Sequence, residues 1–176
     1  MRRLLLLRHA KTERDSASGR DRDRALDARG RDDATAIGTW LSQQPDPPPG
    51  RVMVSTALRA RQTWELLPQA LRTVPVEHRD DLYGATTGEL LDIIRTVDGE
   101  PETLLVIAHN PGLHELALAL AGGGDAAARQ ELSRNLPTGS LVEITFPAAE
   151  WLDIALQSGT LTTMMTPKLL RAQSGA

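Results

Sequence analysis

The sequence predicts a three-layer α/β/α fold, in which helices cover both faces of a mainly parallel central sheet. Short apolar runs alternate with segments of helical periodicity, which is the order expected when helices connect parallel strands. The 176 residues are 40% hydrophobic, and neither an internal repeat nor a dividing linker interrupts them, so we expect one domain over residues 1–176. Three apolar runs end abruptly in polar residues, as strands buried on both faces do: Leu4–Leu7, Val52–Val54 and Leu104–Ala108.

A polar loop separates the first strand from the first predicted helix. The loop runs over residues 11–29 with interleaved acids and arginines, and we interpret its segment Asp21-Arg22-Asp23 as surface charge. Apolar residues at helical spacing then predict a helix over Asp33–Leu41. This helix should stop before the proline-rich residues 45–50.

The second strand leads directly into Ser55, which is a good N-cap residue. We expect the helix that it begins to run to about Pro68, followed by a short strand at Val74–Val76. After a loop over residues 80–86, apolar positions on one face predict a helix over residues 87–97. The third strand comes next.

The last third of the chain begins with a helix opened by His109-Asn110-Pro111-Gly112. We expect this Leu- and Ala-rich helix to stop at the triplet Gly122-Gly123-Gly124. Leu141–Phe146 and Trp151–Leu156 alternate in the manner of an antiparallel hairpin, so we expect these late strands at the edge of the sheet.

The composition excludes several classes of function. The 20 basic and 23 acidic residues give a net charge of −3, and the chain has only five aromatic residues, so nothing favours a nucleic-acid or membrane partner. The absence of cysteine excludes disulfide scaffolds, Cys-based zinc sites and thiolate nucleophiles. The N-terminal apolar run is too short for a signal peptide. We therefore expect a soluble, cytoplasmic protein that acts as a monomer.

Two histidines and two arginines follow the three predicted strands. Arg8 and His9 come after the first strand, Ser55 and Arg59 after the second, and His109 after the third. Each residue alone is more often a salt-bridge partner or a structural residue. Ligands of parallel sheets bind at the carboxyl ends of the strands, however, so all five should meet at one edge.

This set of side chains is suited to phosphoryl chemistry. Guanidinium groups match phosphate oxygens, and a helix N-terminus adds N–H donors. One neutral histidine could attack the phosphorus to form a phosphohistidine, while the second stabilises the charge on the oxygens. This scheme requires neither a metal nor another cofactor. The sequence also lacks the nucleotide-binding P-loop, the His-Glu-x-x-His zinc motif and the Gly-x-Ser-x-Gly elbow.

Three segments resemble the histidine phosphatase (phosphoglycerate-mutase-like) superfamily. They are Leu7–Lys11, similar to its Arg-His-Gly/Ala signature; Ser55–Thr63, similar to its Ser-x-Ala-x-Arg-Ala-x-Gln-Thr helix; and Val106–Pro111, similar to its second-histidine segment. Further segments are similar to the short SixA-type phosphohistidine phosphatases: Arg24-Ala25-Leu26 with Gly30, Leu82–Ala85, and Pro137–Ser140 with Trp151 and Pro167. The resemblance thus extends over nearly the whole chain and implies the fold of that superfamily.

The resemblance also implies roles for individual residues. They are His9 as the nucleophile, Arg8 and Arg59 as phosphate clamps, His109 as the second histidine, Arg24 as a further clamp, and Asn110 and Ser55 in substrate binding. Larger members carry a glutamate general acid near residues 80–83, which include no glutamate here. Asp81 is the nearest candidate for an acid and Glu13 the second, with the alternative that neither acts.

The expected activity is hydrolysis of phosphohistidine in proteins, such as histidine phosphotransfer domains of signalling relays. An imidazole can be protonated from solvent and leave as a neutral base, whereas an alkoxide needs an acid. Two alternatives stay open: a phosphatase of small phosphoesters or other phosphoproteins, and a noncatalytic phosphate-binding module. The short chain leaves no room for insert domains, so we expect an open, shallow, locally positive pocket.

Overall fold

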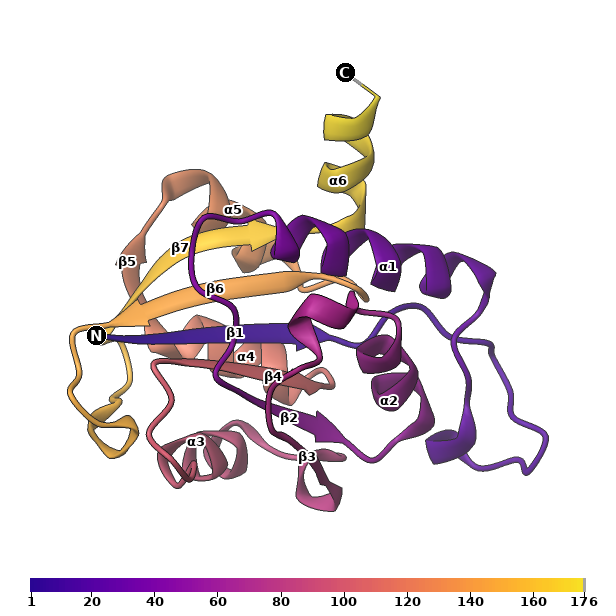
Figure 1. Ribbon diagram of the computed structural model, residues 1–176, viewed down its shortest axis with the longest axis horizontal. Helices are drawn as coiled ribbons and strands as arrows, with labels where there is room; N and C mark the ends of the chain where they lie inside the picture. Colours follow the sequence, from indigo (N-terminus) through magenta and orange to yellow (C-terminus); the bar gives the residue numbers. More distant parts are fainter. Residues whose placement is uncertain (176) are drawn as a thin grey trace.

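A seven-stranded sheet forms the centre of the computed structural model, which describes residues 1–175 (Figure 1). The strand order is β3-β2-β4-β1-β6-β7-β5. Strand β6 pairs antiparallel with β1 and β7, and the other neighbouring pairs are parallel, so the predicted mainly parallel sheet is confirmed. The strands are β1 (Arg2–Arg8), β2 (Arg51–Ser55), β3 (Val76–Arg79), β4 (Thr103–Ala108), β5 (Ala121–Gly124), β6 (Leu141–Phe146) and β7 (Gly159–Met165).

Helices pack on both faces of the sheet because the central strands are apolar on both sides (Figure 1). Leu4 and Leu6 join a core with α3, α4 and α5, whereas Leu5 and Leu7 join a core with α1, α2 and α6. The three-layer prediction is therefore confirmed. The helices are α1 (Ala28–Ser42), α2 (Leu58–Glu65), α3 (Thr87–Arg95), α4 (Gly112–Leu120), α5 (Ala126–Arg134) and α6 (Pro167–Ser174).

The register of three parallel strands brings the candidate site together. Arg8 at the end of β1 lies opposite Ala108 at the end of β4, and Val54 of β2 lies opposite Ile107 of β4. The backbone N–H of His9 donates to the Ala108 carbonyl at 3.2 Å, which extends the ladder by one residue. The residues that follow these strands therefore emerge at one edge of the sheet.

Three boundaries in the first half differ from the prediction. Helix α1 begins at Ala28, five residues earlier than expected, because the Asp27 side chain accepts a hydrogen bond from the Gly30 N–H and caps the first turn. Ser55 does not cap helix α2: Ala57 occupies that position, and Ser55 ends β2. Strand β3 begins at Val76, where the predicted strand ended.

The last third differs more. Helix α4 does end before the glycine triplet, but the glycines form strand β5 at the sheet edge. This strand needs glycine because a Cβ at Gly122 or Gly124 would lie only 1.9–2.1 Å from a neighbouring backbone oxygen. The expected strand at 151–156 is wrong: Trp151–Asp153 is a 3₁₀ turn whose tryptophan is buried, and the partner of β6 is β7. Helices α5 and α6 were not predicted.

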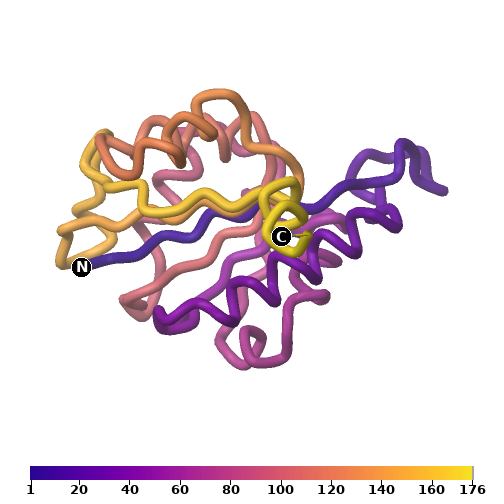
Figure 2. The backbone as a smooth tube through the Cα atoms, turned by 90° about the horizontal axis from the view of Figure 1, so that it is seen from above, coloured from indigo at the N-terminus to yellow at the C-terminus, as the bar shows by residue number. Residues whose placement is uncertain are grey.

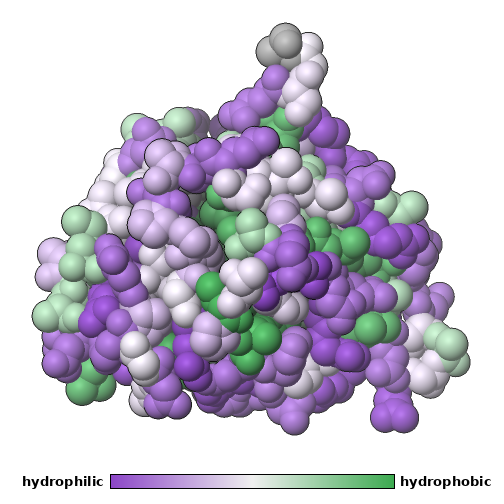
Figure 3. All heavy atoms as spheres, in the orientation of Figure 1, coloured by the Kyte–Doolittle hydropathy of each residue, from purple (hydrophilic) through white to green (hydrophobic). Residues whose placement is uncertain are grey.

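The polar loop after β1 projects beyond the sheet at the end opposite the N-terminus (Figure 2). It contains a short 3₁₀ turn, Asp21–Asp23. In the orientation of Figure 1 the surface is mostly hydrophilic, with hydrophobic side chains in small separate groups (Figure 3). Within residues 1–175, no helix combines the length and the apolar character needed to cross a membrane.

Gly30 is expected to be essential for the packing of α1 against the segment after His9. A Cβ at Gly30 would lie 1.9 Å from the Lys11 carbonyl oxygen, whereas a Cβ at Gly88 in α3 would meet nothing within 4 Å. We expect Gly30→Ala to lower the free energy of unfolding by about 1–3 kcal/mol. The control Gly88→Ala should leave it unchanged or raise it by up to about 1 kcal/mol. Urea denaturation measures both, and equal effects would contradict this packing.

Candidate active site

His9 lies at the base of the site with one ring nitrogen free for chemistry. Its Nδ1 lies 2.8 Å from the Ala10 carbonyl oxygen. Because a carbonyl oxygen can only accept a hydrogen bond, the ring proton is on Nδ1 and the lone pair is on Nε2. The side chain is buried, and burial, with help from His109, Arg59 and Arg8, lowers its pKa from 6.5 to about 3. His9 is therefore a neutral imidazole at neutral pH, as a nucleophile requires.

His109 lies beside His9, with 5.1 Å between the ring centroids. Its Nε2 is 2.7 Å from the Ser55 hydroxyl, whose oxygen also accepts the Ala57 N–H at 3.3 Å. This favours a Ser55 hydroxyl that donates to Nε2, which places the ring proton on Nδ1. Nδ1 is buried without a partner, so its proton can bind an incoming oxygen atom. Burial first, and then Arg59, lowers the pKa of His109 to about 4.

The two arginines supply the positive charge of the site. Arg8 donates from Nη1 to the Leu136 carbonyl at 2.9 Å, and its Nε is buried without a partner. Arg59 is 7% exposed and binds Asp21 twice, through the backbone oxygen at 2.8 Å and through Oδ2 at 3.0 Å. A guanidinium has five N–H groups, so Arg59 retains three for a ligand.

Helix α2 and the turn before β6 hold the backbone after β1 in place. Thr63 accepts the Ala10 N–H at 3.0 Å, and Gln62 accepts the Leu26 N–H at 2.8 Å. Gly139, whose φ of +73° favours glycine, donates its N–H to the carbonyls of Arg8 and His9. The side chains of the Ser55–Thr63 segment thus fix the geometry around His9 as well as supplying Arg59.

Asp21 and Tyr83 belong to the site although the sequence did not place them there. Asp21 is exposed, as its interpretation as surface charge implies, but its carboxylate also binds Arg59, Arg24 at 2.9 Å and the Tyr83 hydroxyl at 2.6 Å. Tyr83 also contacts the His109 ring edge-on, with centroids 5.6 Å apart. An acidic residue three positions before Arg24 was the signal available, but nothing marked it among the many charges of the loop.

The remaining predicted residues lie around this centre. Arg24 reaches Asp21, Thr12 and the Glu13 carbonyl, so it contacts the site through Asp21. Asn110 donates to the Leu136 carbonyl, which Arg8 also binds, and its Oδ1 is buried without a partner. Ser55 is fully buried behind His109, where it can position that ring. Direct substrate contacts of Asn110 and Ser55 stay predictions.

The partner of Asp81 is Arg79 and not one of the site histidines. Both of its oxygens accept hydrogen bonds from Arg79, at 2.9 and 2.6 Å. Arg79 lowers the pKa of Asp81, which keeps the carboxyl ionised and unsuited to donating a proton. Glu13 is exposed in the polar loop. The arrangement thus favours the alternative in which neither residue acts as an acid.

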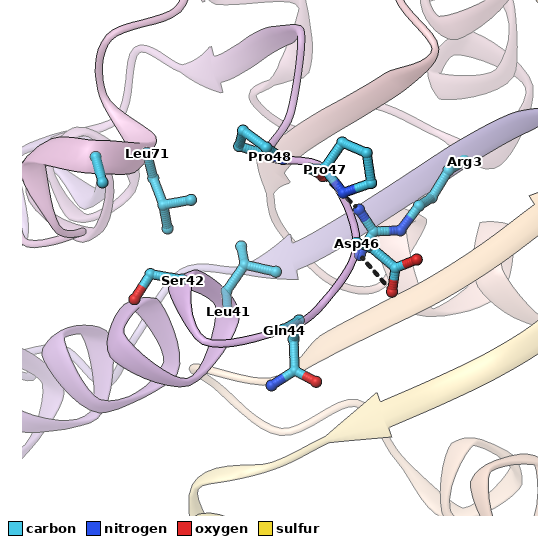
Figure 4. Close-up of a pocket in the computed structure, with 9 residues that line it drawn as sticks. Arg3, Leu41, Ser42, Gln44, Asp46, Pro47, Pro48 and Leu71 are labelled. Carbon is cyan, nitrogen blue, oxygen red and sulfur yellow. Dashed lines mark hydrogen bonds and ion pairs between the residues drawn. The ribbon is translucent and has the colours of Figure 1, made fainter.

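A pocket at the opposite end of β1 does not share this chemistry (Figure 4). It includes Arg3, whose guanidinium already binds Glu143 at 2.7 Å and the Pro47 carbonyl at 3.0 Å. Arg3 and Arg8 are five residues apart on an extended strand, or roughly 16 Å. No histidine lines this pocket, so we assign the chemistry to the edge that carries His9.

Comparison with known proteins identifies the class of this site. The family model for branch 1 of the histidine phosphatase superfamily matches residues 4–92. The chain is 34% identical over 164 residues to MT1313, an uncharacterized Mycobacterium tuberculosis protein, covering 92% of this chain and all of the relative. The chain therefore belongs to the histidine phosphatase superfamily, which supports phosphatase activity.

Solved structures place the chain among the SixA-type members. A candidate phosphohistidine phosphatase SixA from Nakamurella multipartitia has a TM-score of 0.82 and 30% identity, covering 94% of this chain and 96% of the other. A second such SixA, from Agrobacterium tumefaciens, has a TM-score of 0.76 and 25% identity, covering 94% and 99%. The predicted family and fold are thus confirmed.

The two site histidines should remain neutral across the physiological range. Their pKa values of about 3 and about 4 lie below 6.5, so the NMR ring signals of His9 and His109 should move little between about pH 8 and about pH 5. The unfolded chain binds protons there that the folded chain does not. The free energy of unfolding that comes from these two histidines is therefore fully present above pH 6.5. It is lost as the pH falls toward their pKa values in the folded protein. A midpoint near 6.5 for His9 would contradict the assignment.

Removal of the Ser55 hydroxyl should impair catalysis through His109. Ser55→Ala leaves the buried Nε2 without its partner, a loss of about 1–3 kcal/mol. We expect kcat/KM on p-nitrophenyl phosphate to fall about tenfold with the thermal midpoint measured in parallel. The exposed Ser133 of α5 provides the control, since Ser133→Ala should leave activity unchanged. An unaltered kcat/KM in Ser55→Ala would show that Ser55 does not position His109.

Proposed function

We propose that this protein is a phosphohistidine phosphatase that acts on other proteins through a covalent phosphohistidine on His9. The observation that carries the proposal is the free Nε2 of a neutral, buried His9 beside Arg8 and Arg59. The two guanidinium groups are suited to hold a phosphoryl group in front of that nitrogen. The SixA-type structural relatives, described as candidate phosphohistidine phosphatases, support the same assignment.

The proposed reaction has two displacements at phosphorus. In the first, the His9 Nε2–P bond forms while the bond to the leaving nitrogen breaks, and its electron pair returns to the leaving imidazole. In the second, a water oxygen attacks phosphorus, the Nε2–P pair returns to His9, and the released proton stays on the phosphate product or passes to solvent. Arg8, Arg59 and the Nδ1–H of His109 stabilise the oxygens in both steps.

The nature of the leaving group follows from the acids near the site. Arg79 holds Asp81 as a carboxylate, and hydrogen bonds from Tyr83, Arg24 and Arg59 hold the pKa of Asp21 well below its usual value. Neither residue can readily protonate a departing alkoxide. A phosphoimidazole needs no such acid, because solvent protonates its other nitrogen near neutral pH. Phosphohistidine therefore suits this site better than a phosphoester.

A protein substrate, such as a histidine phosphotransfer domain, suits the position of the site. The histidines follow the strand ends, and the adjacent polar loop projects beyond the sheet (Figure 2). Asp21 and Arg22, which adjoin the site, are about half exposed. A phosphorylated side chain on another protein could therefore reach Arg59 without displacing any part of the sheet.

His9→Ala should abolish turnover while phosphate binding persists. We expect the kcat on a phosphohistidine peptide to fall about 10³-fold or more, because the nucleophile is lost. Inorganic phosphate should still bind, since Arg8, Arg59 and His109 remain; isothermal titration calorimetry measures its affinity. His78 is exposed on the edge strand β3, so His78→Ala provides the control and should retain full activity.

Three outcomes would contradict the proposal. A phosphoenzyme trapped by rapid acid quench with its phosphate on any residue other than His9 would exclude the covalent mechanism. Turnover retained in His9→Ala would exclude it as well. Wild-type protein that hydrolyses a sugar phosphate faster than the phosphohistidine peptide would show that the substrate is a phosphoester.

A further inference from the structure

Asp21 is the carboxylate that contacts the phosphate-binding arginine directly. Its Oδ2 lies 3.0 Å from Arg59 Nη2 and 2.6 Å from the Tyr83 hydroxyl, while Oδ1 binds Arg24 at 2.9 Å. An anion at this position is unfavourable for a site that must attract a phosphoryl dianion. Its presence therefore calls for a role that outweighs this repulsion.

The burial of the site residues shows which way a leaving group must depart. His9, Arg59 and His109 are 7–8% exposed and form the base of the site. The side chain of Asp21 is 50% exposed, and Tyr83 is half-buried next to it, so both lie at the mouth. In-line attack by His9 from the base expels the leaving group on the opposite side of phosphorus. A leaving group on a protein substrate therefore passes the mouth, where the Asp21 carboxylate lies.

The charged side chains at the mouth are arranged in ion pairs, and Asp21 belongs to the pair that includes Arg59. Arg22 stacks over the Tyr83 ring at 4.9 Å, but its charge is paired with Asp80 at 2.8 Å. Arg24 is bound to Asp21 itself, and Arg59 faces the phosphoryl position. Two ion pairs at the mouth are thus Arg22 with Asp80 and Arg24 with Asp21. Asp21 bonds directly to Arg59, so its carboxylate lies next to the position at which Arg59 would hold a phosphoryl group.

We propose that Asp21 is a specificity-determining residue that selects phosphoryl groups carried on a basic, positively charged nitrogen. The proposal rests on the proposed function and names the residue that favours a nitrogen-linked over an oxygen-linked phosphate. A protonated phosphoimidazole carries its positive charge next to the bond that breaks, and a carboxylate at the mouth stabilises that charge. A phosphoester whose alcohol part is uncharged receives no such stabilisation, and a substrate with an extra anionic group is repelled.

The step is balanced without a proton from Asp21. The substrate imidazole arrives protonated on the nitrogen that does not carry phosphorus. When the His9 Nε2–P bond forms and the substrate P–N bond breaks, the electron pair returns to the imidazole and neutralises its charge. It leaves as neutral imidazole with that proton in place, and Asp21 remains a carboxylate throughout.

Asp21→Asn tests this role because asparagine keeps the shape and one acceptor oxygen but removes the charge. The wild type and the variant are compared on a phosphohistidine peptide and on p-nitrophenyl phosphate in the same buffer. We expect kcat/KM on the peptide to fall about tenfold, as expected for the loss of one partly screened charge at close range. On the ester it should stay within about twofold of the wild type or rise, since the lost anion repelled the phosphate.

Asp23 provides a matched control in the same turn. Its side chain is 48% exposed, close to the 50% of Asp21, but it binds Arg20 and Ser18 and not Arg59. Asp23→Asn should leave the ratio of the two kcat/KM values unchanged. Tyr83→Phe, which removes one hydrogen bond to Asp21 but keeps the ring, should change the ratio in the same direction as Asp21→Asn and by less. Circular dichroism and thermal midpoints establish that the variants are folded.

The outcomes separate this inference from the proposed function. An equal loss on both substrates in Asp21→Asn would show that Asp21 only orients Arg59, and an unchanged ratio would show that its charge does not select the leaving group. Either result overturns the role of Asp21 and leaves the phosphohistidine assignment intact. A wild-type protein that hydrolyses the ester but not the peptide would overturn the proposed function itself.

Discussion

Strands β1, β2 and β4 end at one level of the sheet, and the geometry of the site depends on this register. Arg8 lies opposite Ala108, so the residues that follow both strands emerge side by side. Backbone bonds then hold the emerging segment: the His9 N–H donates to Ala108, and the N–H of Gly139 donates to the carbonyls of Arg8 and His9. A slip of one residue in β1 would exchange its two buried faces and move His9 out of the site. The apolar residues of β1 pack against helices on both faces of the sheet. They therefore also hold Arg8 and His9 in position.

Burial gives the side chains of the site their chemical state. Desolvation disfavours the charged form of His9 and His109, and the arginines nearby add to this, so both rings are neutral. Each ring then has a defined hydrogen, because Ala10 accepts from one and Ser55 is bonded to the other. The two neighbouring rings thus provide one free lone pair and one free N–H. In the proposed mechanism the lone pair attacks phosphorus and the N–H stabilises the phosphoryl oxygens.

The sequence predicted the layers of the fold and the centre of the site because both depend on local, strongly patterned segments. Buried strands followed at once by Arg8, His9 or His109 could be recognised from residue type alone. The polar loop carried no such pattern: Asp21 and Asp23 look alike in the sequence, and only the folded loop brings one of them to Arg59. Strand β5 was not predicted from its glycines for a similar reason. Glycine permits a close approach to a neighbouring backbone, but whether that approach occurs depends on the tertiary structure and not on the local sequence.

The pairing of charges explains how a mildly acidic protein presents a site for an anion. Several surface arginines near the site have an acidic partner, as in Arg22 with Asp80 and Arg79 with Asp81, so their fields largely cancel beyond a few ångströms. Arg8 forms no ion pair within residues 1–175, and Arg59 shares the carboxylate of Asp21 with Arg24. The attraction for a phosphoryl group is therefore confined to the pocket. Long-range steering contributes little, and in the proposed mechanism a phosphate must enter deeply enough to meet the half-buried Arg8 and the buried Arg59.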